Sequence, residues 1–244
     1  MIYHELLRDD YSYKEAKKLQ KKYRETLREE KSTQGFYIQK ADIEYIIGVD
    51  ISYFQKDQQD HGMACAILWN YESNNLVNKY FSKSIIKFPY KAGFLGFREN
   101  NLISKAIKKS KIRPDVIMCD GHGIIHPLRF GEATHLGFAL QIPSFGVAKN
   151  PFIGFGNWDE LNRFKGNKTP VWSKDPDKNP PDTNEKIGYA VCLSEKRKPV
   201  FVSSGYKINL DLALKLSLET TFQHRQPEPL HLADKFSRKR IKSL

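Results

Sequence analysis

The stretch "YIIGVDISYF", residues 45–54, is typical of a mostly apolar β-strand, and it carries an acid, Asp50, in its middle. Two more strand-like runs follow after short connections, "GMACAILWN" at 62–70 and another at about 76–87. The residues "ESNN" at 72–75 supply the turn between these two runs. Three consecutive strands with short connections predict an antiparallel meander that begins at the first stretch.

After the meander, helices and strands alternate. Apolar residues recur at helical spacing over 98–110 and again over 130–140, and short apolar strands follow at 115–119 and 143–149. A meander followed by α-β-α-β predicts an α/β fold with a mixed sheet of ribonuclease-H-like topology, flanked by helices. In that topology the first strand lies centrally, and the strand at 115–119 pairs beside it.

The remaining segments extend this core at both ends of the chain. Residues 150–186 hold five of the twelve prolines, which favours a long irregular loop or excursion over core structure. The other segments predict an amphipathic helix at 12–31, a hairpin from 186–194 and 199–205, a helix capped by Asn209, and a basic helix in the tail after a Pro-stopped turn. There is no internal repeat, and we expect residues 1–244 to form a single domain.

The composition favours a polyanionic partner. Forty Lys and Arg against 28 Asp and Glu give a net charge of +12, which is typical of nucleic-acid binding but also compatible with solubility alone. Cys65, Cys119 and Cys192 each lie in an apolar run and form no CxxC, which favours reduced, packed thiols. No segment has the apolar length of a signal peptide or a membrane span, so we expect a soluble, cytoplasmic protein without a membrane partner.

A second acid, Asp120, ends the strand at 115–119 and precedes "GHG". The predicted topology brings Asp50 and Asp120 side by side, where two carboxylates repel unless a cation lies between them. Mg²⁺ takes a few carboxylates and leaves room for phosphate oxygens, so the pair predicts metal-assisted phosphodiester hydrolysis. Taken singly, Asp50 also fits a hydrogen-bonded structural acid, and Asp120 fits a cap on the following turn.

Three further features have both a functional and a structural interpretation. Glu99, which we expect to open the helix after "FPYKAGFLGFRE" (88–99), is either a third carboxylate beside the metal or a complement to the helix dipole. The aromatic, Gly-containing loop that precedes it is either a core plug or a device that wedges into a base stack and holds an extruded base. Lys149, which ends the strand at 143–149, is either ordinary surface or a cation for the phosphate transition state. His122, His126 and His135 fit no zinc spacing, and no P-loop or GxSxG motif is present.

Together these stretches resemble the endonuclease V family, the deoxyinosine-directed DNA repair nucleases. The matching pieces, in the family's order, are "GVDISY" (48–53), "FPYKAGFLGFRE" (88–99), "PDVIMCDGHGIIHP" (114–127), "FGEATHLG" (130–137), "IPSFGVAK" (142–149), "PVFVSSG" (199–205) and "PEPLHLAD" (227–234). The resemblance implies a ribonuclease-H-like fold and Mg²⁺-dependent nicking of the second phosphodiester bond 3′ to deoxyinosine (hypoxanthine) in DNA. The expected products carry 3′-hydroxyl and 5′-phosphate ends, and Mn²⁺ is expected to substitute for Mg²⁺.

By position, the resemblance also implies roles for single residues. Asp50, Glu99 and Asp120 look like the catalytic metal-binding carboxylates, with Lys149 on the phosphate side. Tyr90 matches the wedge that fills the gap left by the flipped base. The positions that match the base pocket and its approach are Gly93, Leu95, Gly121 and His126.

This chain departs from the family pattern at three places. Pro89-Tyr90-Lys91-Ala92 replaces Pro-Tyr-Ile-Pro, which should loosen the loop and weaken lesion discrimination. Glu132 stands where small apolar residues are usual and needs a partner, for which Arg129 is the nearest candidate. Asp234 stands where some members have a His near the metal, and an acid there would orient a metal-bound water.

Two alternatives remain beside the leading prediction of a monomeric deoxyinosine endonuclease. One is a ribonuclease-H-like nuclease that prefers inosine in RNA or structured DNA. The other is a nucleic-acid-binding module without catalysis, which is disfavoured because all three carboxylates and Lys149 are present. The sequence is compatible with one metal ion or two.

Overall fold

The meander that begins at residue 45 is present in the computed structural model, which describes residues 2–244. The strands β1 (Tyr45–Lys56), β2 (Gln59–Asn70) and β3 (Asn75–Ile85) pair antiparallel in that order. On the other side of β1, β4 (Val116–Cys119) pairs parallel to it, and β5 (Ser144–Ala148) pairs parallel to β4. The predicted ribonuclease-H-like arrangement, with the first strand in a central position, is therefore confirmed.

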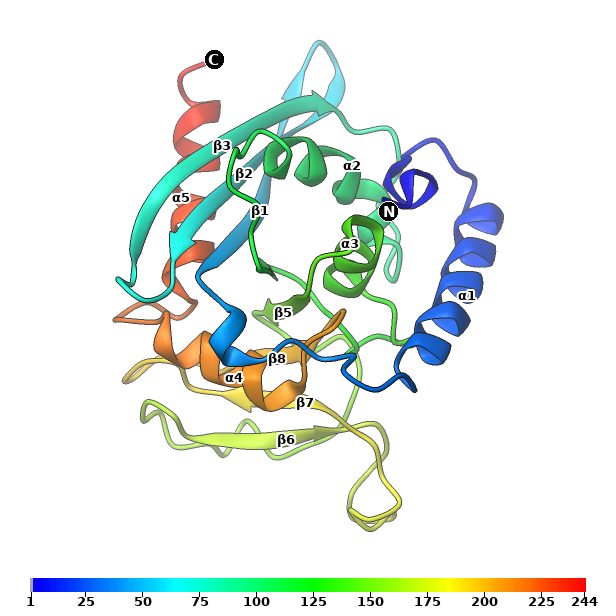
Figure 1. The fold of residues 1–244 in the computed structure, drawn as a ribbon, viewed down its shortest axis with the longest axis vertical. Coiled ribbons are helices and arrows are strands. Elements are labelled where there is room, and N and C mark those ends of the chain that lie inside the picture. The colour runs from blue at the N-terminus through cyan, green and yellow to red at the C-terminus, as the bar shows by residue number, and fades with distance from the viewer. Residues whose placement is uncertain (1) are drawn as a thin grey trace.

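Three further strands extend the sheet beyond β5. β8 (Val200–Ser204), β7 (Lys186–Val191) and β6 (Lys168–Trp172) add antiparallel neighbours, so the eight-stranded order is β3-β2-β1-β4-β5-β8-β7-β6 (Figure 1). The hairpin of β7 and β8 was predicted, but the prediction that 150–186 is irregular throughout was wrong. β6 lies at the sheet edge, where Pro170 can be accommodated although it lacks an N–H group, and Val171 beside it is buried.

Helices cover both faces of this sheet. Their bounds are α1 (Tyr13–Glu30), α2 (Leu95–Ile107), α3 (Glu132–Leu140), α4 (Leu210–Glu219) and α5 (Glu228–Ile241), with short 3₁₀ turns at η1 (His4–Leu7) and η2 (Lys40–Asp42). Successive strand residues point to opposite faces. Ile47 and Val49 accordingly join the core under α1, α2 and α3, while Ile46 joins the core under α4 and α5.

The helix ends follow the local sequence. Ser12 and Glu15 form a capping box at the start of α1, which satisfies backbone N–H groups that the first helical turn leaves free. The side chain of Asn209 accepts a 2.8 Å hydrogen bond from the backbone N–H of Leu212, which confirms the predicted cap of α4.

The C-terminal helix α5 lies unusually close to β1. A Cβ atom added to Gly48 would lie 2.4 Å from the Cβ of Pro229, so only glycine at this position permits the approach. Further along, the Oγ atoms of Ser52 and Ser237 lie 2.7 Å apart in a hydrogen bond. This packing holds the later turns of α5 beside the middle of β1, where Asp50 lies.

Two smaller expectations can also be compared with the fold. Cys65, Cys119 and Cys192 are all buried free thiols, as their apolar surroundings predicted. Within residues 2–244, no helix combines the length and apolar character that crossing a bilayer requires.

Candidate active site

The first feature of the site is the pair of acids on adjacent strands. Val49 on β1 pairs with Cys119 on β4, and the backbone N–H of Asp120 donates a 3.2 Å hydrogen bond to the carbonyl of Val49. Asp50 and Asp120 therefore follow paired residues of parallel strands. Burial, and then the nearby charge of Asp120, raise the pKa of Asp50 well above its ordinary value.

Lys149 provides the cation nearest to this pair. It follows β5, the strand next to β4, and its Nζ atom lies 2.6 Å from Oδ2 of Asp120. The Lys149 side chain is 43% exposed and the Asp120 side chain only 11%, so the lysine reaches from solvent to a largely covered carboxylate. Its charge lowers the pKa of Asp50, but burial and the charge of Asp120 outweigh it.

Glu99 lies in the second turn of α2, and it does not open the helix as the sequence suggested. The helix begins at Leu95 and has no acid in its first turn, so the helix-dipole explanation for Glu99 does not apply. Glu99 is buried and accepts a hydrogen bond from the hydroxyl of Tyr53. Burial raises the pKa of Glu99 to about 7, although hydrogen bonds with Tyr53 and Glu132 act to lower it.

Glu132, the first residue of α3, is a fourth buried acid beside Glu99. It is 5% exposed, and within residues 2–244 its Oε2 atom has no hydrogen-bond partner. Burial and the charge of Glu99 raise the pKa of Glu132 well above its usual range. A Cβ atom on Gly121 would lie only 2.2 Å from this Oε2, so the carboxyl group fills the space that glycine leaves.

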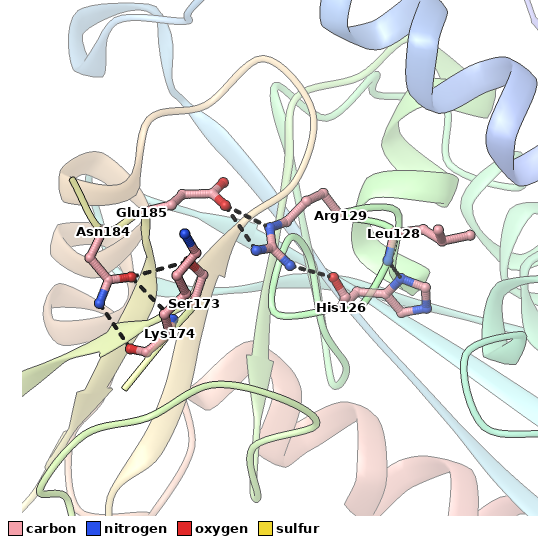
Figure 2. Close-up of polar contacts among 7 residues, drawn as sticks. All are labelled: His126, Leu128, Arg129, Ser173, Lys174, Asn184 and Glu185. Carbon is pink, nitrogen blue, oxygen red and sulfur yellow. Dashed lines mark hydrogen bonds and ion pairs between the residues drawn. The ribbon is translucent and has the colours of Figure 1, made fainter. Parts of the chain in front are cut away.

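Arg129 is not the partner of Glu132, and that expectation was wrong. Figure 2 shows its guanidinium turned toward Glu185. Nε and Nη2 lie 3.0 and 2.8 Å from Oε2 of Glu185, and Nη1 donates a 2.9 Å hydrogen bond to the carbonyl of His126. The adjacent Asn184 bonds to the backbone of Lys174 through both ends of its amide. Arg129 therefore ties the loop after β4 to the segment before β7.

A cavity of about 320 Å³ opens next to the acids. Its lining includes all the residues that the resemblance connects with the base, namely Tyr90, Gly93, Leu95, Gly121 and His126, together with Asp120, Glu132 and Lys149. This volume lies at the lower end of the roughly 300–1,000 Å³ that small-molecule sites occupy. We call it the base cavity.

The wall of the base cavity is held by polar contacts to one carbonyl. Gly93 has a φ of +85°, a conformation that favours glycine, and its carbonyl accepts a 2.7 Å hydrogen bond from the amide of Gln20. Nε2 of His126 lies 3.1 Å from the same oxygen. Tyr90, by contrast, is 72% exposed at the edge of the cavity, free to meet a ligand.

Sequence reasoning missed Gln20, Tyr53 and Phe152. Gln20 lies in the apolar stripe of α1 with Ala16 and Tyr23, so a polar residue at a buried helical position was the available signal. The Phe152 ring, with its centroid 5.5 Å from that of His126, lines the base cavity from the loop after β5, and no pattern in the sequence indicated this position. His135, in turn, is a structural residue whose Nε2 lies 2.7 Å from the carbonyl of Leu6.

A second cleft, of about 620 Å³, adjoins the acids along α5. Asp50, Ser52, Lys149, Asp234, Arg238 and Lys242 are among the residues that line it, and we call it the α5 cleft. Asp234 accepts a 2.7 Å hydrogen bond from Nε of Arg238, and its charge contributes to the raised pKa of Asp50. Lys149 lines both the base cavity and the α5 cleft.

The donor set suits a hard divalent cation. Asp50, Glu99, Asp120 and Glu132 supply oxygen ligands only, and their mutual repulsion is relieved by positive charge. Within residues 2–244, no three acids, histidines or cysteines already converge in a finished coordination geometry. The buried Oε2 of Glu132, which has no hydrogen-bond partner in residues 2–244, is an oxygen that a bound cation could satisfy.

The chain is similar in sequence to known nucleases. The family model for endonuclease V matches residues 22–235. Endonuclease V of Dictyoglomus turgidum is 37% identical over 202 residues, covering 83% of this chain and 82% of that protein. Endonuclease V of Trichormus variabilis is 37% identical over 216 residues, covering 88% and 91%.

Solved structures give the same result. Endonuclease V from Bacillus subtilis superposes with a TM-score of 0.82 at 28% identity, over 96% of this chain and 94% of that one. Endonuclease V of Ciona intestinalis, in complex with a 24-mer DNA containing an inosine followed by a ribo-adenosine, superposes with a TM-score of 0.75 at 28% identity, over 94% and 97%. The chain therefore belongs to the endonuclease V family of metal-dependent, phosphodiester-cleaving nucleases.

Proposed function

We propose that this protein is a deoxyinosine-directed DNA repair endonuclease that nicks the second phosphodiester bond 3′ to the lesion, with Mg²⁺ as its metal and Mn²⁺ as a substitute. One observation carries the proposal. Lys149, bonded to Asp120, lines both the base cavity and the α5 cleft. A strand with its extruded base in the cavity would thus have a nearby phosphate at the carboxylates.

In this proposal the acids hold the metal and the lysine acts on the phosphate. Asp50, Glu99 and Asp120 would hold Mg²⁺, which when bound supplies an activated water and stabilises the leaving oxygen. Lys149 neutralises charge that develops on the phosphate. Asp234, next to Asp50, is placed to orient a water molecule. Hydrolysis leaves 3′-hydroxyl and 5′-phosphate ends.

Recognition of the base falls to the residues of the base cavity. Gly93, Leu95, Gly121 and His126 surround the extruded hypoxanthine, and Tyr90 fills the gap in the stack. The exposure of Tyr90 supports this role, since a side chain at 72% exposure contributes little to the protein's own packing. Lys91 lies 4.2 Å from the centroid of the Tyr13 ring, a contact that helps to hold the loop in place of the missing second proline.

The substrate is proposed to be DNA, and inosine in RNA is the second candidate. Both substrates are kept as candidates because of the ligand in the Ciona intestinalis structure. That ligand is a DNA in which a ribo-adenosine follows the inosine. The net charge of +12 fits either polymer. We further propose that the chain acts as a monomer of one domain in the cytoplasm, which its single continuous sheet and three free thiols support.

The test uses matched DNA and RNA strands, each with one inosine, incubated with and without Mg²⁺. We expect a metal-dependent nick one nucleotide past the inosine, and no nick with Asp120→Ala. Equal cutting by the variant would overturn the metal-site assignment, and a preference for the RNA strand would favour the second candidate. If both strands stay intact but are bound, the protein is a binding module.

A further inference from the structure

Beyond the proposed roles of Asp50, Asp234 and Lys149, the α5 cleft has no assigned part in the proposed reaction, although it shares Lys149 with the base cavity. Asp120 lines only the base cavity, whereas Asp50 lines only the α5 cleft. The two spaces therefore meet at the pair of acids. A polymer that is cut at these acids has to continue beyond them, and the α5 cleft is one of the spaces into which it can continue.

Arg238 and Lys242 bring positive charge and unused N–H donors to this cleft. Arg238 lies in the last turn of α5, Lys242 is the C-cap residue one turn further on, and both are exposed. Arg238 uses Nε to bond Asp234, while its two terminal nitrogens have no hydrogen-bond partner in the described chain, residues 2–244. The ammonium group of Lys242 has no ion pair there either, so both residues can donate to phosphate oxygens.

The cleft is built on a fixed part of α5. The contact between Pro229 and Gly48 and the hydrogen bond between Ser52 and Ser237 hold the helix against β1. Arg238 and Lys242 are therefore presented at a set position relative to Asp50. The negative charge in the cleft is largely compensated, because Asp234 is paired with Arg238 and Asp50 lies near Lys149.

We propose that the α5 cleft binds the phosphates 3′ of the scissile bond, on the strand that carries the inosine, through Arg238 and Lys242. The inference rests on the proposed function. When the cut falls on the second bond 3′ to a base held in the base cavity, the strand past the acids runs in the 3′ direction. The cleft beside Asp50 offers that segment the unpaired ammonium group of Lys242 and the two unused terminal nitrogens of Arg238.

The experiment compares two double variants that remove the same charges from the same helix. Arg238→Gln with Lys242→Gln alters the cleft, whereas Lys239→Gln with Arg240→Gln removes one arginine and one lysine that do not line it. All four side chains are exposed, so both variants should fold, which thermal melting checks. Binding is measured by fluorescence anisotropy without divalent metal, so that no strand is cut.

The strands form a truncation series in single-stranded DNA. One ends just past the expected scissile bond, one runs several nucleotides further in the 3′ direction, and a third is shortened on the 5′ side instead. We expect the cleft variant to bind the 3′-extended strand more weakly than the control variant does, and to bind the 3′-truncated strand equally well. If two phosphate contacts are lost, the slope of log affinity against log salt should become less negative by about 1.4, and only for the 3′-extended strand.

Two outcomes would overturn the inference. If the cleft variant loses as much affinity for the 3′-truncated strand as for the extended one, the cleft does not hold the 3′ segment. If instead the 5′-shortened strand abolishes the difference, the cleft holds the 5′ side. Failure of the proposed function is visible separately, because the wild-type protein would then bind inosine and adenosine strands equally.

Discussion

The ammonium group of Lys149 lies 2.6 Å from the carboxylate of Asp120, at the place where the base cavity and the α5 cleft meet. In the proposed reaction this lysine stabilises charge on the phosphate. Lys149→Gln should therefore lower kcat by roughly 10²- to 10³-fold, the usual effect of removing one transition-state donor. Because the side chain is 43% exposed, thermal stability should change little. Single-turnover cleavage measures the effect, with Lys105→Gln at the far end of α2 as control, and an unchanged kcat would contradict it.

The carboxyl group of Glu132 should destabilise the metal-free protein. Its carboxyl group is buried beside Glu99, and Oε2 has no partner in residues 2–244. Glu132→Gln keeps the shape and removes the acid, so we expect the free energy of unfolding in EDTA at pH 8 to rise by about 0.5–2 kcal/mol. Urea denaturation measures it. Glu185→Gln, which removes the partner of Arg129, should lower stability instead, and a loss in both variants would contradict the interpretation of Glu132.

Metal affinity should fall as the pH is lowered from 8 to 6. Burial raises the pKa of Glu99 to about 7 and that of Asp50 well above its usual range, so these carboxyl groups keep protons in the metal-free fold. The pKa of Glu99 is higher in the folded protein than in the unfolded chain. Its contribution to the stability of the metal-free fold is therefore complete below the unfolded-state pKa and is lost as the pH rises through the folded-state pKa, near 7. At pH 6 a larger fraction of these carboxyl groups is protonated, so Mg²⁺ binding must displace more protons than at pH 8. Calorimetry in buffers of different ionisation enthalpy should show proton release on Mg²⁺ binding, and a pH-independent affinity without release would be inconsistent with it.

Tyr90 should contribute to substrate binding and not to the stability of the fold. The side chain is 72% exposed at the base cavity, so Tyr90→Ala should leave the melting temperature unchanged. Loss of stacking on a base costs roughly 1–3 kcal/mol, which predicts a fall of about 5- to 150-fold in affinity for inosine strands. Tyr37→Ala, another exposed tyrosine away from the cavity, is the control. Equal affinities for the two variants would exclude the wedge role.

Much of this arrangement could be predicted from periodicity and strand order. The apolar runs of β1, β2 and β4 are local signals, and the predicted topology put Asp50 beside Asp120. β6 could not be predicted in the same way, because Pro170 weakens its strand pattern and its pairing with β7 depends on residues about 20 positions away.

The partner of Arg129 shows a second limit of sequence reasoning. Proximity along the chain suggested Glu132, only three residues away. Arg129 instead adopts a left-handed φ of +54°, which turns the chain, and its guanidinium reaches Glu185, 56 positions further on. Arg129 thus pairs with Glu185 and leaves Glu132 without this cation.

We propose that the acids next to the base cavity form a metal-dependent, inosine-directed nuclease site. It is tested most directly by the rates of cutting an inosine strand and the identical adenosine strand, with Mg²⁺ and with EDTA, and by mapping the cut. We predict cutting only of the inosine strand and only with metal, at the second bond 3′ to the base, and none with Asp120→Asn. Cutting of both strands at equal rates, or cutting that persists in EDTA, would contradict the account.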